Sequence, residues 1–501
     1  MKSKGARAFS AAALFLSVLS VVRLFAQGTN QVHEAKSASE HQLSEIVVSA
    51  SRFEEEAWKS GSSISVVPDQ QIRISRQTQT AETLRGEPGA VVNNNTGVPG
   101  GVSQISIRGL PFSRTLVDVD GLRLNRPIDN IANLTDLPPL ALGNVELLRG
   151  PQSSLYGSEA EGGVVTVSTP RGKGAPSFGT SFEGGTFDTR RERLFSQGTE
   201  SGFDWNVEYA RLDTANQRPN NALRQDAAVV HLGYDISSSA RVDWNSRWTD
   251  YTAGASDSVL GFGANDPDNR LMRRMLLLSP SLTLTPVEIW ETRLTLGFIG
   301  VGQRSDQPPN TGFGTEFVNH SESQQLQWQN TIYATDWNTL VAGIEARREH
   351  TTTSFDSGNN GFNRATQAAY LSDSFRWEDW WGMTLSGRFD DNEGCRDVWT
   401  YRASQFFQLP ETKSRLHMSF GTAFRSPTIS ELKPLFGPGS GENPNLVPET
   451  TEGYDAGMTQ PLLDGKLELD STYFYNSVVN LIETDSNFVF QNVSKMRTEG
   501  V

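Results

Sequence analysis

Residues 105–163 read ISIRGLPFSRTLVDVDGLRLNRPIDNIANLTDLPPLALGNVELLRGPQSSLYGSEAEGG, and this stretch decides the fold of the N-terminal part of the chain. It contains three short runs typical of β-strands, at Ile105–Arg108, Leu116–Val119 and Val145–Arg149. Each run is followed by a glycine, a residue that permits tight turns. Two runs end in Arg-Gly, and a buried arginine needs a carboxylate partner. The stretch therefore predicts a small sheet domain that packs against an acidic surface.

Length and composition narrow the class of protein. The chain has 501 residues and a formal net charge of −14, which suits two domains and argues against a nucleic-acid partner. No internal run of roughly 18 or more apolar residues occurs, so transmembrane helices are not expected. Membrane β-strands remain compatible with the sequence, because their alternation keeps the average hydropathy low. The single cysteine, Cys395, excludes an intrachain disulfide.

The first 26 residues have the pattern of a secretory signal peptide. A basic start precedes the apolar run Ala11–Val22, and Ala26 suits cleavage. A membrane anchor is the alternative, and Arg23 argues against it by interrupting the apolar run. Residues 27–50 are expected to be a flexible segment that ends in Glu45-Ile46-Val47-Val48-Ser49-Ala50. This β-prone run is either the first strand of the next domain or a peptide that joins the sheet edge of a partner.

Two domains are expected after this segment. Residues 51–172 are predicted to form one α+β unit, with a strand at Ile64–Val67, a short helix at Thr80–Arg85 and a closing strand at Gly162–Thr169. From 177 to 501, long runs alternate between apolar or aromatic residues and polar ones. About 16 or 17 such strands, joined by short turns and long polar loops, are typical of an outer-membrane barrel. A soluble β-protein is the alternative, but its apolar faces would be mostly aliphatic.

No catalytic or metal-binding motif stands out. The chain has no Gly-x-Ser-x-Gly, His-Glu-x-x-His or phosphate-binding sequence, and its six histidines are scattered. We therefore predict that the protein is not an enzyme and carries no cofactor. The acidic loop residues Asp257, Asp266 and Asp268 are candidate calcium ligands, with a solvated loop as the alternative.

Several motifs together resemble the TonB-dependent outer-membrane receptors, over residues 43–501. The run from Glu45 to Ala50 is similar to the TonB box of that family. The other matching motifs are Ile107-Arg108-Gly109, Leu116–Asn125, Val145–Pro151, Ser154–Ser158, Gly162-Gly163-Val164, Phe424-Arg425-Ser426-Pro427, Glu431-Leu432, Asn443–Leu446 and Pro448–Thr450.

The resemblance implies a mostly β fold. It consists of a transmembrane antiparallel β-barrel, with about 22 strands in the family, and an N-terminal α+β plug in the lumen. The plug arginines Arg108 and Arg149 would meet barrel carboxylates, one of which is Asp455 here. The other carboxylate would directly follow Val501. We therefore expect this barrel to be truncated, as a fragment or shortened form of a longer protein.

The resemblance also implies active import across the bacterial outer membrane. A scarce ligand binds outside, and the TonB box engages TonB, which is energised by an inner-membrane complex. The sequence looks most like the cobalamin receptors. A ferric siderophore receptor is the first alternative, followed by a passive porin or a non-functional fragment. The ligand-facing plug residues implied by the resemblance are Phe112, Ser113, Arg114, Asn125, Arg126, Asp129 and Asn130.

Overall fold

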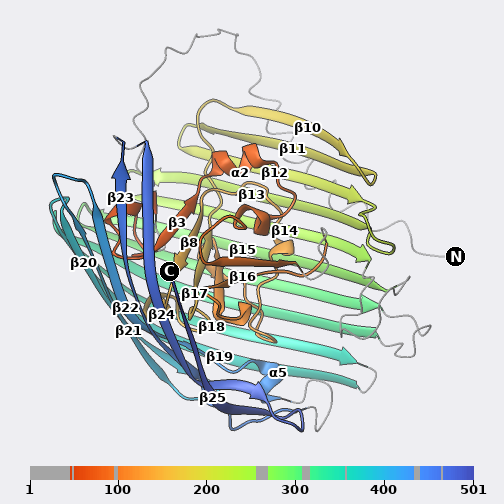
Figure 1. The fold of residues 1–501 in the computed structure, drawn as a ribbon. Coiled ribbons are helices and arrows are strands. Elements are labelled where there is room, and N and C mark those ends of the chain that lie inside the picture. The colour runs from red at the N-terminus through yellow and green to blue at the C-terminus, as the bar shows by residue number, and fades with distance from the viewer. Residues whose placement is uncertain are drawn as a thin grey trace. The chain divides into compact units, whose positions relative to one another are not determined.

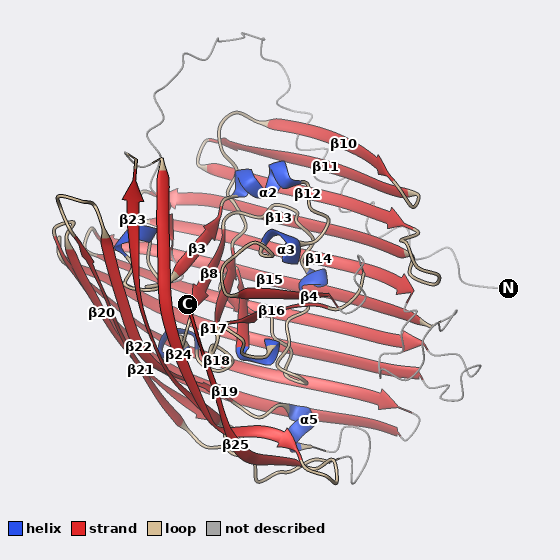
Figure 2. Cartoon of the chain, viewed as in Figure 1, coloured by secondary structure: helices blue, strands red, loops and turns tan. Residues whose placement is uncertain are grey.

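The structure, a computed structural model, describes residues 46–47, 50–94, 100–254, 269–306, 316–355, 358–433, 441–463 and 466–501. All of them fall within one unit, Ser44–Val501. They form a 16-stranded sheet, here called the wall, and a smaller α+β domain at residues 50–169, here called the plug. The plug, red to orange in Figure 1, lies against one face of the wall, and Figure 2 shows that the wall is made of strands whereas the plug combines short strands, helices and loops.

The plug consists of short strands and helices. Their bounds are β1 Ile46–Val47 just before the plug, then β2 Glu55–Glu56, η1 Ala57–Lys59, β3 Ile64–Val67, α2 Asp69–Ser75, α3 Thr80–Thr83, β4 Ala90–Asn94, β5 Ser103–Ile107, η2 Phe112–Arg114, β6 Thr115–Val119, β7 Leu122–Arg123, η3 Leu134–Asp136, β8 Val145–Arg149, α4 Ser153–Tyr156 and β9 Gly163–Val167. The main plug sheet has the order β3-β8-β9-β6-β7, and only β6 and β9 are parallel. The strands predicted around β3, β5, β6, β8 and β9 are confirmed, whereas α2 and β4 were not predicted.

The glycines that follow the three predicted strands form turns. Gly109, Gly121 and Gly150 have φ angles of 75°, 83° and 81°, in the left-handed region that glycine adopts without steric cost. Gly163 serves a different purpose, because a Cβ atom there would lie 2.3 Å from the carbonyl oxygen of Leu148. The absence of a side chain thus allows β8 and β9 to approach each other.

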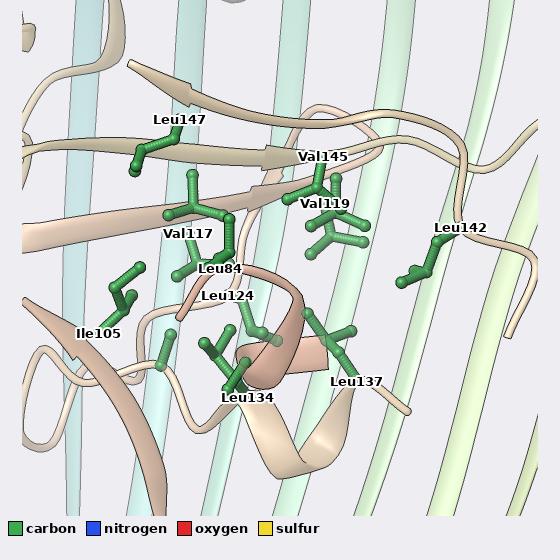
Figure 3. Packing of buried hydrophobic residues seen from close by; sticks show 14 of the residues in the cluster. Leu84, Ile105, Val117, Val119, Leu124, Leu134, Leu137, Leu142, Val145 and Leu147 are labelled. Atoms are coloured by element: carbon green, nitrogen blue, oxygen red, sulfur yellow. The ribbon is translucent and has the colours of Figure 1, made fainter. Parts of the chain in front are cut away.

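The plug core continues into the wall. Leu84, Val117 and Leu147 are almost fully buried in one cluster, part of which Figure 3 shows. The same cluster includes wall residues on two neighbouring strands, among them Met275 and Ile299. Apolar burial stabilises the plug by roughly 25 cal/mol for each Å² removed from water. The wall therefore supplies part of the hydrophobic stabilisation of the plug.

The wall is one antiparallel sheet in which each strand pairs with the next along the chain. Its strands are β10 Ser177–Gly185, β11 Thr189–Glu200, β12 Phe203–Thr214, β13 Leu223–Ser237, β14 Ala240–Gly254, β15 Arg270–Val287, β16 Trp290–Asp306, β17 Glu316–Thr335, β18 Asn338–Phe355, β19 Gly358–Trp377, β20 Trp381–Asn392, β21 Val398–Gln408, β22 Arg415–Arg425, β23 Glu449–Leu462, β24 Leu467–Thr484 and β25 Phe490–Gly500. The sixteen strands confirm the predicted number. Within the described residues, the edge strands β10 and β25 are not paired with each other, so the sheet is open.

In the wall, many polar side chains are buried and many apolar side chains are exposed, the reverse of the pattern in a soluble protein. In β12, the polar side chains of Asp204, Asn206 and Glu208 are buried on the face toward the plug, whereas Phe203 is 38% exposed. Trp244, on β14, is 43% exposed. An apolar outer face suits a lipid environment, and the predicted alternation of polar and apolar faces is confirmed. Among the described helices, none is long and apolar enough to cross a membrane.

Candidate functional site

Part of the predicted TonB-box run is folded onto the following chain. Ile46 and Val47 form β1, which pairs antiparallel with β2. The side chains of Val47 and Ala50 are buried. A partner that binds this run by strand addition therefore meets β1 with one edge already paired to β2 and with Val47 buried. The remaining residues of the run, Glu45, Val48 and Ser49, lie outside the described residues.

Arg52 anchors the chain directly after this run. Its guanidinium lies 4.7 Å from the ring centroids of both Tyr156, in the plug, and Tyr370, in the wall. Its Nη1 atom lies 2.9 Å from a carboxylate oxygen of Glu345 on β18. The backbone carbonyl of Arg52 accepts a hydrogen bond from Gln329. Sequence reasoning missed this anchor, because its partners come from distant parts of the chain.

A second anchor lies a few residues further along. Glu55, in β2, forms an ion pair with Arg376 on β19. Lys59 contacts Asp379, in the turn after β19, at 2.9 Å. The wall therefore anchors the chain at β2, the strand that pairs with β1, and again a few residues after β2.

The predicted contact between a plug arginine and Asp455 has clear geometry. Nη1 of Arg108 lies 2.9 Å from Oδ2 of Asp455, and both side chains are almost fully buried. Ser419, on β22, donates a hydrogen bond to the other carboxylate oxygen. The Arg108 guanidinium also lies 4.9 Å from the ring centroid of Phe474. This charged contact links the end of β5 to the middle of β23.

Arg149, the other arginine predicted to meet a wall carboxylate, contacts plug groups instead. Its Nε atom donates to the carbonyl of Pro88 at 2.8 Å, and Nη2 donates to the Ser65 hydroxyl at 2.7 Å. Its nearest carboxylate contact is Glu87, at 3.7 Å. Burial and the neighbouring Arg108 lower the pKa of Arg149 to about 10. The structure therefore brings together Arg108 and Asp455, and places Arg149 inside the plug.

The first predicted ligand loop divides into two kinds of residue. Phe112 and Ser113, in η2, are half-buried. Arg114 is only 3% exposed, and its Nε and Nη2 atoms each donate to Glu449 at 2.8 Å. Such a bidentate contact fixes the orientation of the planar guanidinium. In this state, Phe112 and Ser113 are the more accessible part of the loop.

Hydrogen bonds from a buried side chain hold the conformation of the second predicted ligand loop. Asn125 is buried and accepts a hydrogen bond from the Val117 backbone, while its amide donates to the carbonyls of Thr115 and Asn130. Arg126 is half-buried and donates to Gln303 of the wall. Asn125 therefore shapes the loop from inside, and Arg126 lies closer to its surface. Asp129 is also half-buried and pairs with Arg126.

A wall segment at Ser426–Lys433, here called the cap, covers this second loop. The cap contains helix α5, Ile429–Leu432, whose N-terminus has a capping box between Thr428 and Glu431. The backbone and hydroxyl groups of Ser430 donate to the Ile128 carbonyl, and the Ile429 backbone donates to the Pro127 carbonyl. Asn130 donates to the Ser426 carbonyl at 2.9 Å.

Five buried charged groups meet beneath the cap, and we call them the junction. They are Arg114 and Glu161 from the plug, Arg425 and Glu449 from the wall, and Glu431 from the cap. Arg425 donates to Glu449 at 2.7 Å and to Glu431 at 3.1 and 3.2 Å. The junction therefore connects plug, wall and cap through one network. Its acidic members were not predicted as site residues, although Glu431 and Glu449 lie in the motifs of the family resemblance.

Among the described residues, no group of three or more His, Cys, Asp or Glu side chains is arranged to hold a metal ion. The candidate calcium ligands Asp257, Asp266 and Asp268 lie outside the described residues.

Two family models match the chain. One, for the TonB dependent receptor-like β-barrel, matches residues 174–501. The other, for the TonB-dependent receptor plug domain, matches residues 56–164. Together they match the wall and most of the plug.

Individual relatives agree with these matches. The chain is 26% identical over 468 residues to the vitamin B12 transporter BtuB of Vibrio cholerae, covering 89% of this chain and 72% of that protein. The structure resembles the siderophore receptor PirA from Pseudomonas aeruginosa, with a TM-score of 0.68, 20% identity and coverage of 87% and 80% of the two chains. It also resembles the alcaligin receptor FauA from Bordetella pertussis, with a TM-score of 0.70, 15% identity and coverage of 91% and 78%. The chain therefore belongs to the TonB-dependent receptors, a family of β-barrel transport proteins in the outer membrane.

Proposed function

We propose that this receptor imports cobalamin across the outer membrane. The observation that carries the proposal is the sequence similarity to a protein named as a vitamin B12 transporter. The two chains are 26% identical over 468 residues, which cover 89% of this chain. The half-buried residues Phe112, Ser113, Arg126 and Asp129 offer an aromatic ring, a hydroxyl and charged groups to a large polar ligand. In this proposal, the buried residues Arg114, Asn125 and Asn130 shape the loops instead of contacting the ligand.

We propose that TonB engages residues 45–50 and that energy from an inner-membrane complex then displaces the plug. Release of the run requires the loss of the β1–β2 pairing. The next barrier is the Arg52 anchor, because it ties the chain after this run to Glu345 and Tyr370 of the wall. Import in this scheme moves the ligand without chemical change.

A ferric siderophore is the second candidate ligand. Two proteins named as siderophore receptors share the fold with TM-scores of 0.68 and 0.71, although their low identity carries no ligand assignment. The discriminating experiment is equilibrium binding of cyanocobalamin to the purified chain, with and without excess ferric siderophore. We expect saturable cobalamin binding that the siderophore does not displace. Saturable binding of the siderophore alone would replace the cobalamin proposal.

Two variants sharpen this experiment. Arg126→Ala removes a half-buried cation from the proposed ligand surface and is expected to weaken cobalamin binding about tenfold or more. Arg73→Ala, on α2, removes an exposed cation from an i,i+4 ion pair with Asp69 and serves as the matched control. Equal affinities of both variants would reject the proposed surface.

Energy coupling has its own test. Deletion of residues 45–50 should abolish cobalamin uptake by cells that lack another receptor for it, while binding to the same cells persists. Uptake that survives this deletion would identify a passive pore.

A further inference from the structure

The junction contains more negative than positive groups. Its three carboxyl groups, Glu161, Glu431 and Glu449, face only two guanidiniums, Arg114 and Arg425. None of the five residues is more than 9% exposed. An uncompensated charge is costly at such a place, because burial removes its hydration. One carboxyl group is therefore expected to be neutral when the junction is assembled.

Contacts identify Glu161 as that carboxyl group. Glu449 receives hydrogen bonds from Arg114, Arg425 and the Ile482 backbone. Glu161 receives one from the Thr451 hydroxyl at 2.6 Å, and its nearest guanidinium nitrogen, on Arg114, is 3.5 Å away.

The other oxygen of Glu161 has no hydrogen-bond partner within the part of the chain that the structure describes. The groups that face Glu161 are Arg114 from η2, Glu449 and Thr451 from β23, and Arg425 from β22. Burial and the nearby charge of Glu449 raise the pKa of Glu161 to about 7.

The cap carries one member of the junction. Glu431 lies in α5 and pairs with Arg425 in the structure, in which the cap is seated on the plug loop. If the cap departs with Glu431, two carboxylates face two guanidiniums. The remaining charges then balance without a proton on Glu161. The protonation state of Glu161 should therefore differ between the seated and departed positions of the cap.

We propose that Glu161 binds a proton when the cap is seated and releases it when the cap departs. Glu161 is a positioning residue in this scheme, because it acts on the cap through Arg114, Glu449 and Arg425. The scheme does not depend on which ligand the receptor imports. Linkage fixes the sign of the effect. Because the seated state binds the additional proton, rising pH favours departure, by at most about tenfold per pH unit for one proton.

The test uses the full chain in lipid nanodiscs, with a nitroxide label on the cap at Lys433→Cys in a Cys395→Ser background. The ratio of mobile to immobile label is measured from pH 5 to pH 9. We expect this ratio to rise with pH by up to tenfold per unit below about pH 7 and to level off above it, where Glu161 is ionised in both positions of the cap. Glu161→Gln keeps the shape of the side chain and stays neutral, so it should hold the cap seated and flatten the profile. Asp69→Asn, on the exposed face of α2, should leave the profile unchanged.

A second measurement keeps the proposal testable if Glu161→Gln folds poorly. Infrared difference spectra of the unsubstituted chain should show a protonated carboxyl band that disappears as the pH rises through about 7. In Glu431→Gln, which removes one junction charge, the loss of this band should move to lower pH. A flat label profile in the unsubstituted chain, the same profile in Glu161→Gln, or a band that Glu431→Gln does not shift would overturn the proposal.

Discussion

Arg108 of the plug and Asp455 of the wall form a buried ion pair, with 2.9 Å between Nη1 and Oδ2. The pair joins segments that are 347 residues apart in the sequence. Both side chains are shielded from water, so loss of one partner leaves an uncompensated charge.

Asp455→Ala should weaken the attachment of the plug by about 3–5 kcal/mol, the range typical for breaking a buried pair. The measurement is the free energy of unfolding of the plug in urea, followed by a fluorophore on the plug. The double variant with Arg108→Ala should cost less than the sum of the two single changes. Asp213→Ala, which breaks the more exposed pair with Arg211, is the control and should cost less than about 1 kcal/mol. Equal effects at both positions would contradict a specific role for the buried pair.

Arg52→Ala should release the segment before it. The variant loses the ion pair with Glu345 and the contacts with two tyrosine rings, so β1 should leave β2 more often. A cysteine at Val47, a buried position, reports this opening through its rate of reaction with a maleimide in a Cys395→Ser background. We expect the rate to rise about tenfold or more in Arg52→Ala and to stay constant in Arg73→Ala. Unchanged labelling in Arg52→Ala would show that other contacts hold the segment.

Gly163→Ala should destabilise the plug, because the added methyl group would lie 2.3 Å from the Leu148 carbonyl oxygen. The backbone must shift to relieve this contact, and we expect a cost of roughly 1–3 kcal/mol. Gly86→Ala provides a matched control in the same domain, since nothing lies within 4 Å of its added Cβ. Chemical denaturation of both variants decides the matter, and equal stabilities would contradict the predicted clash.

The stability of the plug should depend on the ionisation of Asp118. Burial raises the pKa of Asp118 from 3.8 to about 6 in the folded plug, so the folded state holds this proton more tightly than the unfolded state. The resulting stabilisation is present at pH values below about 4 and is lost as the pH rises through 6, up to about 3 kcal/mol in total. Asp118→Asn can still accept the hydrogen bond from the Gly121 backbone, but it does not ionise. The difference in urea stability between the two proteins should therefore vary between pH 4 and pH 7; a constant difference would argue against the shift.

Local features of the plug were predictable from sequence, whereas distant partners were not. The strand Val145–Arg149 matches its predicted bounds, because alternation and a following glycine define it within a few residues. By contrast, Arg149 turns toward Glu87 and Ser65, neighbours that only the folded plug brings close.

Arg114 shows the same limit. The family resemblance implied a ligand contact for Arg114, whereas its guanidinium donates to Glu449, 335 residues later. Sequence patterns identify a charged residue that needs a partner, but only the three-dimensional arrangement selects that partner.

The shared core of plug and wall has a consequence for biogenesis. Plug residues such as Leu147 pack in one cluster with Met275 and Ile299, which are synthesised much later. The part of the chain that leaves the ribosome first therefore completes its folding only after later strands have arrived. During export, its apolar side chains remain exposed and prone to aggregation. Delivery to the outer membrane should therefore depend on periplasmic chaperones that keep the chain unfolded and soluble.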